Sequence, residues 1–502
     1  FWESARRGAR LEGRTAAGKW QALAEDPLPL GESSYLAAYQ ARPLTELRLR
    51  VRQVPGIALA VRRLRLLSPT EVLTTLKRYE IVSARAHRDL FPPVLHDEQV
   101  YWTVVGVPAG LRKSLFDEYG DLEAYKGAPL VQPLWRDQAG SATAAFEASR
   151  TQTLRRGWMP LPAVRWSPRP GLQLTSEAIA DQPSSGAVTL VRHRLTNTGS
   201  TRIDGQLAML VRPIQVNPAW QHGGLSPINT VRIEDSAAHT RVVVNDRILL
   251  VSLTPVARRT AAPFGPHGET ELTHYLSEGQ RLPYASDARA EDGLAAAALL
   301  YEVHLEPGAS YDAVLAFPLA DATAPVADVS QLSFEASSAR LEEQWQARFG
   351  RVGLTLPDAS LVDMLRAQAA YMLINQSGPA IQPGPRNYSR SFIRDGSATA
   401  MVLLRLGLAG TARDYLSWYA AHAVHENGLV SPILNADGSV NRGFGSDLEH
   451  DSQGEFVALV AEVARLDGGA ASVRQYQPQV RGALKFLEQL RARTLVPGYM
   501  GA

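Results

Sequence analysis

Cysteine is absent from this 502-residue chain, and lysine is scarce. Without cysteine the protein has no disulfide, no thiolate nucleophile and no Cys-ligated zinc. Only five of the 52 basic residues are Lys, and 50 acidic residues balance them, which leaves a formal net charge of +2. So small a charge favours neither nucleic acid nor an acidic membrane as a partner. The missing cysteine is compatible with both a bacterial exported protein and a cytoplasmic one.

Apolar runs long enough to cross a membrane are also missing. Residues 293–303 form an Ala-rich apolar run, whereas a membrane-spanning helix needs roughly 18 residues or more. We therefore expect no membrane span. The chain begins with Phe1 instead of Met, so we expect a processed or trimmed protein from which any signal peptide has been removed.

Several motifs of catalysis do not occur in the sequence. There is no P-loop, no Gly-x-Gly-x-x-Gly and no Gly-x-Ser-x-Gly, which removes the motif-based case for a nucleotide cofactor or a serine hydrolase. His422 and His425 are spaced i, i+3, but no third ligand accompanies them. We expect neither a cofactor nor a metal.

The first two thirds of the chain have the pattern of antiparallel β-structure. Residues 1–40 show weak periodicity, but from 47 to 67 apolar residues alternate with Arg, as in half-buried strands with a solvated basic face. Between 99 and 330, short apolar segments separated by Gly, Asn and Pro turns favour a sandwich. We expect a strand at 100–105 and three hairpins, formed by residues 188–195 with 206–211, 241–244 with 247–251, and 299–305 with 311–317.

The remainder of the chain has the pattern of helices. After Asp321 the composition shifts to Ala and Pro, which indicates a linker, and residues 337–349 then predict a helix with a Ser start. Further helices are expected at 358–374, 395–408, 411–425, 451–467 and 478–493. The expected division is an N-terminal segment with strands (1–90), a large antiparallel β-sandwich (91–330), a linker helix (331–352) and a helical domain (353–502).

A segment at residues 386–406 combines charged groups with a helix that is largely apolar. Arg390, Arg394 and Asp395 lie at the junction between a loop and this helix, with the aromatic Tyr388 nearby. Charged groups at such a junction can face a cleft while the helix behind them is held in a core. The local alternative is that Asp395 caps the helix and pairs with Arg394.

A second charged segment lies at residues 447–455. If a helix begins at about Asp451, then Asp451 and Glu455 share one face at i, i+4, and two neighbouring carboxylates raise each other's pKa. The alternative is that both acids only stabilise the helix N-terminus. Asp447 and Glu449 on the preceding loop are placed either to meet a ligand or simply to lie in solvent.

Together, the two segments resemble a known family. Arg394-Asp395-Gly396 at the head of a helix is similar to the first motif of glucoamylase-like six-hairpin glycosidases. Glu449-His450-Asp451-Ser452-Gln453-Gly454-Glu455 is similar to the carboxylate-x-Asp-x-x-Gly opening of a later inner helix in that group. The resemblance covers roughly residues 335–502, and the order of sandwich, linker helix and helical domain supports it.

The resemblance implies a multidomain β + α protein with a supersandwich-like β domain and part of an (α/α)6 toroid. It also implies that Arg394 and Asp395 grip sugar hydroxyls. Toroids of this family use twelve helices, so we expect the sequence to stop mid-toroid, with the general acid and the general base both beyond Ala502. Residues 47–67 faintly resemble the end of a discoidin-like sandwich.

Three functions follow as hypotheses. The first is a bacterial glycoside hydrolase, periplasmic or secreted, that acts on a glucan-like oligo- or polysaccharide by inversion, and the second is a glycoside phosphorylase with Arg390 and Arg442 near the phosphate. The third is a carbohydrate-binding protein without catalysis. The expected partners are a carbohydrate and the remaining C-terminal part of the same polypeptide. We expect the site to be lined by Tyr388, Arg390, Arg394, Asp395, Asp447, Glu449, Asp451 and Trp220. Glu449 and Asp451 are also weak catalytic candidates, and Trp220 has the alternative of packing between domains.

Overall fold

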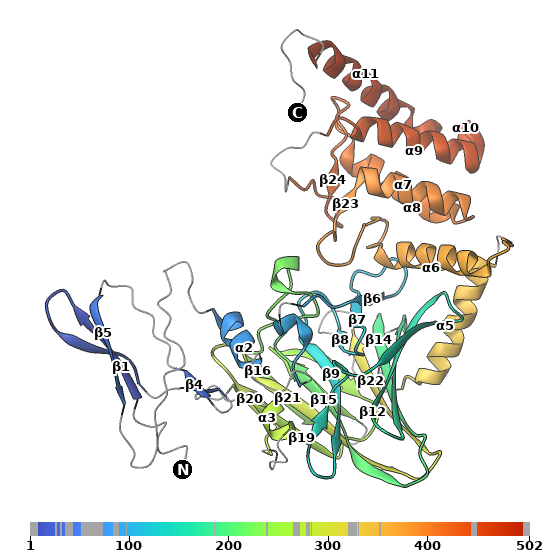
Figure 1. Ribbon diagram of the computed structural model, residues 1–502. Helices are drawn as coiled ribbons and strands as arrows, with labels where there is room; N and C mark the ends of the chain where they lie inside the picture. The colour runs from blue at the N-terminus through green and yellow to red at the C-terminus, as the bar shows by residue number, and fades with distance from the viewer. Residues whose placement is uncertain are drawn as a thin grey trace.

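The protein is a multidomain β + α structure, in which strands occupy the first part of the chain and helices the last (Figure 1). The computed structural model describes residues 9–25, 28–30, 33–35, 44–51, 74–83, 90–96, 98–184, 186–236, 239–264, 272–277, 282, 284–319, 329, 331–350, 353–442 and 449–494.

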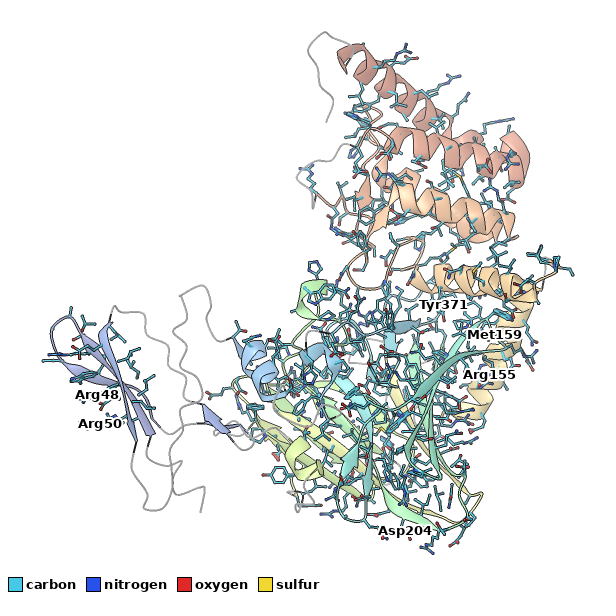
Figure 2. The ribbon with its side chains drawn as sticks, in the orientation of Figure 1. Arg48, Arg50, Arg155, Met159, Asp204 and Tyr371 are labelled. Carbon is cyan, nitrogen blue, oxygen red and sulfur yellow. The ribbon has the colours of Figure 1, made fainter. Side chains whose placement is uncertain are left out.

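A small antiparallel sheet stands at the N-terminus, where the sequence predicts no confident structure before residue 40. Its strand order is β2 (Trp20–Glu25), β1 (Ala9–Thr15) and β5 (Leu44–Val51). The buried carboxylate of Glu12 on β1 pairs with Arg48 and, at 3.5 Å, with Arg50, both labelled in Figure 2. The strand predicted from residue 47 is therefore confirmed as far as residue 51, and residues 52–67 lie outside the described residues.

The apolar side of β5 differs from the expectation of a half-buried strand. Leu47 and Leu49 are 39% and 43% exposed, while the charged side of the sheet holds the buried Glu12. The alternation of residue types correctly indicates which side chains share a face. The leucines stay partly exposed because a three-stranded sheet by itself has no second layer to cover them. Near it, β3 (Leu28–Leu30) pairs with β4 (Ser33–Tyr35).

The β domain is a sandwich of two antiparallel sheets around one core. The nine-stranded sheet runs in the order β11-β12-β13-β14-β22-β18-β17-β16-β20. Its strands are Arg150–Arg155, Met159–Arg169, Leu172–Asp181, Val188–Asn197, Ser310–Pro318, Arg247–Ser252, Thr240–Val244, Thr230–Asp235 and Asp287–Arg289. Between the sheets lie fully buried side chains such as Leu174, Leu207 and Leu299.

The facing eight-stranded sheet runs in the order β19-β21-β15-β9-β8-β7-β6, with β10 paired to β9. Its strands are Arg258–Ala262, Ala296–Leu305, Ile203–Arg212, Leu130–Asp137, Leu122–Glu123, Ser114–Asp117, Trp102–Val105 and Ala142–Thr143. Strand β6 confirms the strand predicted at 100–105. The short helices described in this part of the chain are α2 (Thr75–Ser83), η3 (Pro93–His96), η4 (Ala219–Gln221) and α3 (Thr273–Ser277).

Two of the three predicted hairpins are wrong. β17 and β18 do pair with each other, as expected for residues 241–251. However, β14 pairs with β13 and β22, whereas β15 pairs with β9 and β21 in the opposite sheet. β21 and β22 are separated between the sheets in the same way. The connections from β14 to β15 and from β21 to β22 are both short enough for a hairpin. Each of these strands has an apolar face, however, and when the chain crosses to the other sheet the two apolar faces pack against each other in one core.

Helix α5 (Phe334–Phe349) confirms the predicted linker helix and begins three residues earlier than the prediction. Its N-cap is Ser333, whose side chain accepts a hydrogen bond from the backbone N–H of Ala336. Phe334, Trp345 and Phe349 belong to a second core with Met159, a residue of the nine-stranded sheet. The helix therefore covers the outer face of that sheet (Figure 1).

The helical domain continues this second core. Its helices are α6 (Ala359–Asn375), α7 (Ile393–Arg405), α8 (Ala409–Ala423), α9 (Ser452–Leu466), α10 (Gly469–Ser472) and α11 (Gln477–Thr494), with the 3-10 turn η5 (Arg474–Tyr476) before α11. The five predicted helices are confirmed with shifts of one or two residues at most ends. Leu403, Leu416 and Phe456 bury the contact between α7, α8 and α9. Between α8 and α9, isolated bridges join Val424 with Val430 and Leu434 with Val440.

Candidate functional site

The loop that leads into α7 is held in place by a short pair of strands. Residues 391–392 form β23, which pairs with β24 (Ile433–Leu434), and the N–H of Ile393 donates to the carbonyl of Pro432 at 3.0 Å. The helix begins directly after this pair at Ile393, so the side chains of its first turn have a fixed direction. No side chain caps it.

Arg394 links the head of α7 to the head of α9. Its Nε donates to Asp451 Oδ2 at 2.6 Å, and its Nη2 donates to Glu449 Oε2 at 3.0 Å. These acids are more than 50 positions further along the chain, and the packing of α7 against α9 brings them together. The side chains of Arg394, Asp451 and Glu449 are 61%, 39% and 35% exposed, so the cluster is open to a ligand.

The ion pair determines the protonation of this cluster. The hydrogen bond from Arg394 holds the pKa of Asp451 below its usual value, and Asp451 in turn raises the pKa of Arg394. The expectation that Asp451 and Glu455 raise each other's pKa is therefore wrong for Asp451. Glu455 instead accepts a hydrogen bond of 2.6 Å from Ser397 Oγ on α7. Glu455 therefore joins α9 to α7, whereas Asp451 pairs with Arg394.

Asp395 occupies the first turn of α7 and is exposed. The local alternative, in which it caps the helix and pairs with Arg394, is not what the structure shows, because Phe392 is the N-cap and the Arg394 guanidinium pairs with Asp451 and Glu449. Asp451 likewise stands at the N-cap of α9 without a side-chain capping bond. Both carboxylates are thus available to a ligand at the same end of two neighbouring helices.

Gly396 fixes the distance between α7 and α8. A Cβ atom at this position would overlap the hydroxyl and ring of Tyr415, which is fully buried on α8. Burial raises the pKa of Tyr415, so its hydroxyl stays protonated. The sequence identified Gly396 only as part of a motif. Its role in packing depends on Tyr415 of the neighbouring helix, which the motif does not include.

The loop before α7 contributes an aromatic ring and a second cation. Tyr388 is 57% exposed, with its ring 5.8 Å from the ring of Phe392. The guanidinium of Arg390 lies 5.6 Å from the centre of the same Phe392 ring, and its Nη1 donates to Asn441 Oδ1 at 3.3 Å. Phe392 therefore supports both side chains, and Arg390 is brought beside the segment that carries Arg442.

A buried ion pair that the sequence analysis missed anchors this loop to the β-sandwich. Arg386 Nε donates to Glu123 Oε1 at 2.9 Å, and the two side chains are 6% and 0% exposed. Lys126 Nζ donates to the Arg386 carbonyl and to Ser389 Oγ. Lys113 Nζ donates to Ser377 Oγ at 3.0 Å, and burial is the main cause that lowers the pKa of Lys113 to about 8. Glu123 is a single charged residue on a short strand and Arg386 lies in a loop, so neither gave a sequence signal of this contact.

The remaining expected site residues have different outcomes. Asp447 lies outside the described residues. Trp220, on η4 (Ala219–Gln221), is 62% exposed, so the alternative of a packed interface residue does not hold in the described structure, and stacking on a sugar stays a prediction. Within the described ranges, no cluster of His, Asp and Glu suited to a metal ion is present, and none of the helices has the length and apolar character to cross a membrane.

The similarity of this chain to known proteins is distant. No protein-family model matches the chain, and neither does a curated protein. Among solved structures it is similar to a protein provisionally assigned as a kojibiose phosphorylase from the human microbiome, with a TM-score of 0.39 and 11% identity over 73% of this chain and 49% of that one. The chain thus spans about half the length of that protein.

Two other solved structures are similar at a lower level. One is ccman5, a glycosyl hydrolase of the GH92 family, with a TM-score of 0.34 and 12% identity over 76% of this chain and 61% of that one. The other is a polysaccharide lyase, with a TM-score of 0.24 and 9% identity over 78% of this chain and 68% of that one. At these scores the three structures do not by themselves define the fold or the activity of this chain.

Proposed function

We propose that this chain is part of a carbohydrate-active enzyme whose helical domain belongs to an (α/α)6 toroid and binds a terminal sugar of a glucan-like oligo- or polysaccharide. The reaction proposed is hydrolysis of a glycosidic bond with inversion. The observation that carries the proposal is the cluster of Arg394, Asp451 and Glu449, with the exposed Asp395 beside it, at one end of α7 and α9.

This cluster suits the hydroxyl groups of a sugar. Each hydroxyl both donates and accepts a hydrogen bond, so a site needs fixed acceptors next to fixed donors. Asp451 and Asp395 supply carboxylate acceptors, while the guanidinium of Arg394 supplies several donors in one plane. Tyr388, with its exposed ring supported by Phe392, gives an apolar surface for the C–H face of a pyranose.

The electrostatics of the cluster support a binding role for Asp451. Because Arg394 holds its pKa low, Asp451 stays ionised at neutral pH and is unsuited to donate a proton to a leaving group. Inversion requires a general acid and a general base about 6.5–9.5 Å apart with a water between them. The proposal assigns Arg394, Asp395 and Asp451 to substrate binding, and leaves the acid and base to other residues.

A test of this function begins with the purified protein and its complete polypeptide. We expect reducing sugar to be released from one of a panel of α- and β-linked glucans, and we expect Asp395→Asn to abolish release with little change in thermal stability. NMR of the first product would show the anomeric configuration opposite to that of the substrate. Undiminished release by both Asp395→Asn and Arg394→Ala would refute the proposed site.

A second candidate is phosphorolysis by the same fold. The specific observation is that Arg390 donates to Asn441, which places it beside Arg442, and among the described residues no carboxylate forms an ion pair with either arginine. Two such cations suit an inorganic phosphate. Sugar-1-phosphate formation that needs phosphate and is lost in Arg390→Ala would select this reaction. Sugar binding without any turnover would instead select a non-catalytic binding protein.

A further inference from the structure

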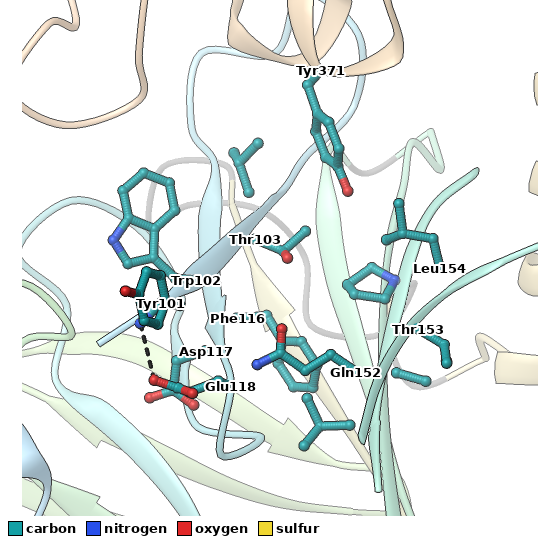
Figure 3. Close-up of a pocket in the computed structure, with 14 residues that line it drawn as sticks. Tyr101, Trp102, Thr103, Phe116, Asp117, Glu118, Gln152, Thr153, Leu154 and Tyr371 are labelled. Carbon is teal, nitrogen blue, oxygen red and sulfur yellow. Dashed lines mark hydrogen bonds between the residues drawn. The ribbon is translucent and has the colours of Figure 1, made fainter. Parts of the chain in front are cut away.

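A pocket in the β-sandwich lies outside the candidate site. It is a cavity of about 450 Å³ at the edge where β6, the last strand of one sheet, lies over β12 of the other, with β11 beside β12 (Figure 3). Tyr371 enters it from α6, so the helical domain closes one side. The volume falls within the range of roughly 300–1,000 Å³ that is usual for small-molecule sites.

Aromatic rings form one wall of this pocket. Trp102 is held in place because its indole Nε1 donates to Asn217 Oδ1 at 2.9 Å. Tyr101 next to it is 72% exposed at the mouth, so its ring is open to an incoming ligand. With Phe116 further in, these rings present apolar surface to whatever enters from solvent.

Polar groups without a protein partner face the same cavity. The hydroxyl of Tyr371 and the hydroxyl of Thr103 point into it, and neither forms a hydrogen bond with the described part of the chain (Figure 3). Gln152, exposed on β11, adds an amide at the opposite side. A half-buried hydroxyl is normally paired, so unpaired ones that converge on a cavity favour a hydrogen-bonding ligand.

Asp117 contributes a carboxyl group from inside the sandwich. Its side chain is only 4% exposed, and its Oδ1 accepts from the backbone N–H groups of Tyr119 and Asp121, both at 2.9 Å. Asp117 is one of the residues that line the cavity. Burial raises the pKa of Asp117 to about 7, so the group offers both a donor and an acceptor near neutral pH.

The charges at the pocket argue against an ionic ligand. The carboxylate of Glu118 accepts from Arg150 at 2.7 Å, so its charge is already neutralised, and Asp117 with a pKa of about 7 carries only part of a negative charge at neutral pH. An anion would meet two acidic side chains, and a cation would find only this partial charge. Neutral hydroxyl groups on an apolar ring match both the aromatic wall and the unpaired polar groups.

We propose that this pocket is a second carbohydrate-binding site, which holds one neutral pyranose unit of an oligosaccharide between the rings of Tyr101 and Trp102 and the polar groups of Asp117, Thr103 and Tyr371. The site is separate from the cluster around Arg394 and does not depend on catalysis there. A site on the sandwich would hold a long oligosaccharide on the protein while one of its ends binds in the helical domain. In this one respect the inference rests on the proposed function.

The test uses a variant in which the helical-domain site has been removed. Saturation-transfer NMR and calorimetry are carried out with maltotetraose, cellotetraose and laminaritetraose on the complete protein carrying Tyr388→Ala and Arg394→Ala. We expect this double variant to retain binding of at least one tetrasaccharide. Adding Tyr101→Ala should weaken that binding tenfold or more, and adding Tyr371→Phe, which removes one hydroxyl only, should weaken it severalfold.

Matched controls keep the result interpretable. Tyr284→Ala removes another ring that is 79% exposed, and it should leave tetrasaccharide binding unchanged. Circular dichroism would establish that each variant is folded. Loss of all binding in the Tyr388→Ala, Arg394→Ala variant, or residual binding that neither Tyr101→Ala nor Tyr371→Phe weakens, would overturn the second site, as would preference for tetramethylammonium over sugars. Sugar release in the wild type would remain a separate test of the proposed function.

Discussion

The Arg394 guanidinium and the Asp451 carboxylate meet at 2.6 Å across the heads of α7 and α9, although 57 positions of sequence separate them. Asp451 occupies the N-cap of α9 but makes no side-chain capping hydrogen bond, and its carboxylate is engaged by Arg394 instead. It also keeps the carboxylate ionised. Two helix ends that are individually ordinary thereby form one polar cluster with a fixed geometry.

The first prediction concerns this pair. Asp451→Asn should weaken binding of the terminal sugar by roughly tenfold to a hundredfold, because a hydrogen bond to a charged group contributes about 1.5–3 kcal/mol. Calorimetry with a glucan oligosaccharide measures the change. Glu462→Gln is the matched control, since Glu462 also joins α9 to α7, through Arg405 at 3.1 Å, but at the other end of the helices. Equal losses in both variants would contradict a local binding role.

The sequence was sufficient to predict the helices and the two charged segments. Apolar residues at helical spacing predicted α6 to α9 closely, because each of these helices buries one face in the same core. The order of strands was less predictable. Val188–Asn197 and Ile203–Arg212 are joined by a short turn, yet they enter opposite sheets, since pairing is decided by distant strands and not by the turn.

For the candidate site, the sequence indicated the residues but not which of them contact each other. Arg394, Asp395 and Asp451 were identified as candidates, whereas the pairing of Arg394 with Asp451, in place of Asp395, depends on the packing of two helices. Arg386 and Glu123 were missed altogether. Each has ordinary neighbours in the sequence, and only the contact between the domains makes them a buried pair.

The second prediction concerns that buried pair. Arg386→Met should destabilise the protein by about 3–5 kcal/mol, because it leaves the Glu123 carboxylate buried without its partner. The change is measured from denaturant midpoints. The double variant Glu123→Gln, Arg386→Met should recover part of the loss, since no uncompensated charge remains. Arg413→Met, which removes an exposed partner of Asp467, is the control and should have little effect. A small loss in Arg386→Met would show that the contact between the domains is not maintained in solution.

The third prediction is a dependence of stability on pH. His193 is buried in the sandwich and paired with Ser176 Oγ at 2.8 Å, and burial lowers its pKa from 6.5 to about 3. Between these values the unfolded chain binds a proton that the folded chain does not. The contribution is therefore present above pH 6.5 and is lost as the pH falls toward 3, at about 1.4 kcal/mol per pH unit.

Urea unfolding from pH 7 to pH 4 tests this dependence. In His193→Gln the slope of the unfolding free energy against pH should decrease by about one proton over this range. The surface control His222→Gln should leave the slope unchanged, because His222 is exposed. An unaltered slope in His193→Gln would mean that His193 is protonated in the folded protein.

The last prediction compares two glycines at the heads of the two helices that carry the site. In Gly396→Ala the added methyl group would overlap Tyr415, so the variant should lose about 1–3 kcal/mol of stability through overpacking. In Gly454→Ala, on α9, no atom lies within 4 Å of the added methyl group, and alanine favours a helix over glycine by about 0.8–1.0 kcal/mol, so this variant should gain stability. Thermal unfolding of both variants measures the two stability changes, which should have opposite signs. Because α8 sets the position of α7 through Gly396, Gly396→Ala should also weaken sugar binding, while Gly454→Ala should not. If both substitutions stabilise the protein, α7 and α8 are not in close contact at Gly396, and the geometry proposed for Arg394 loses its support.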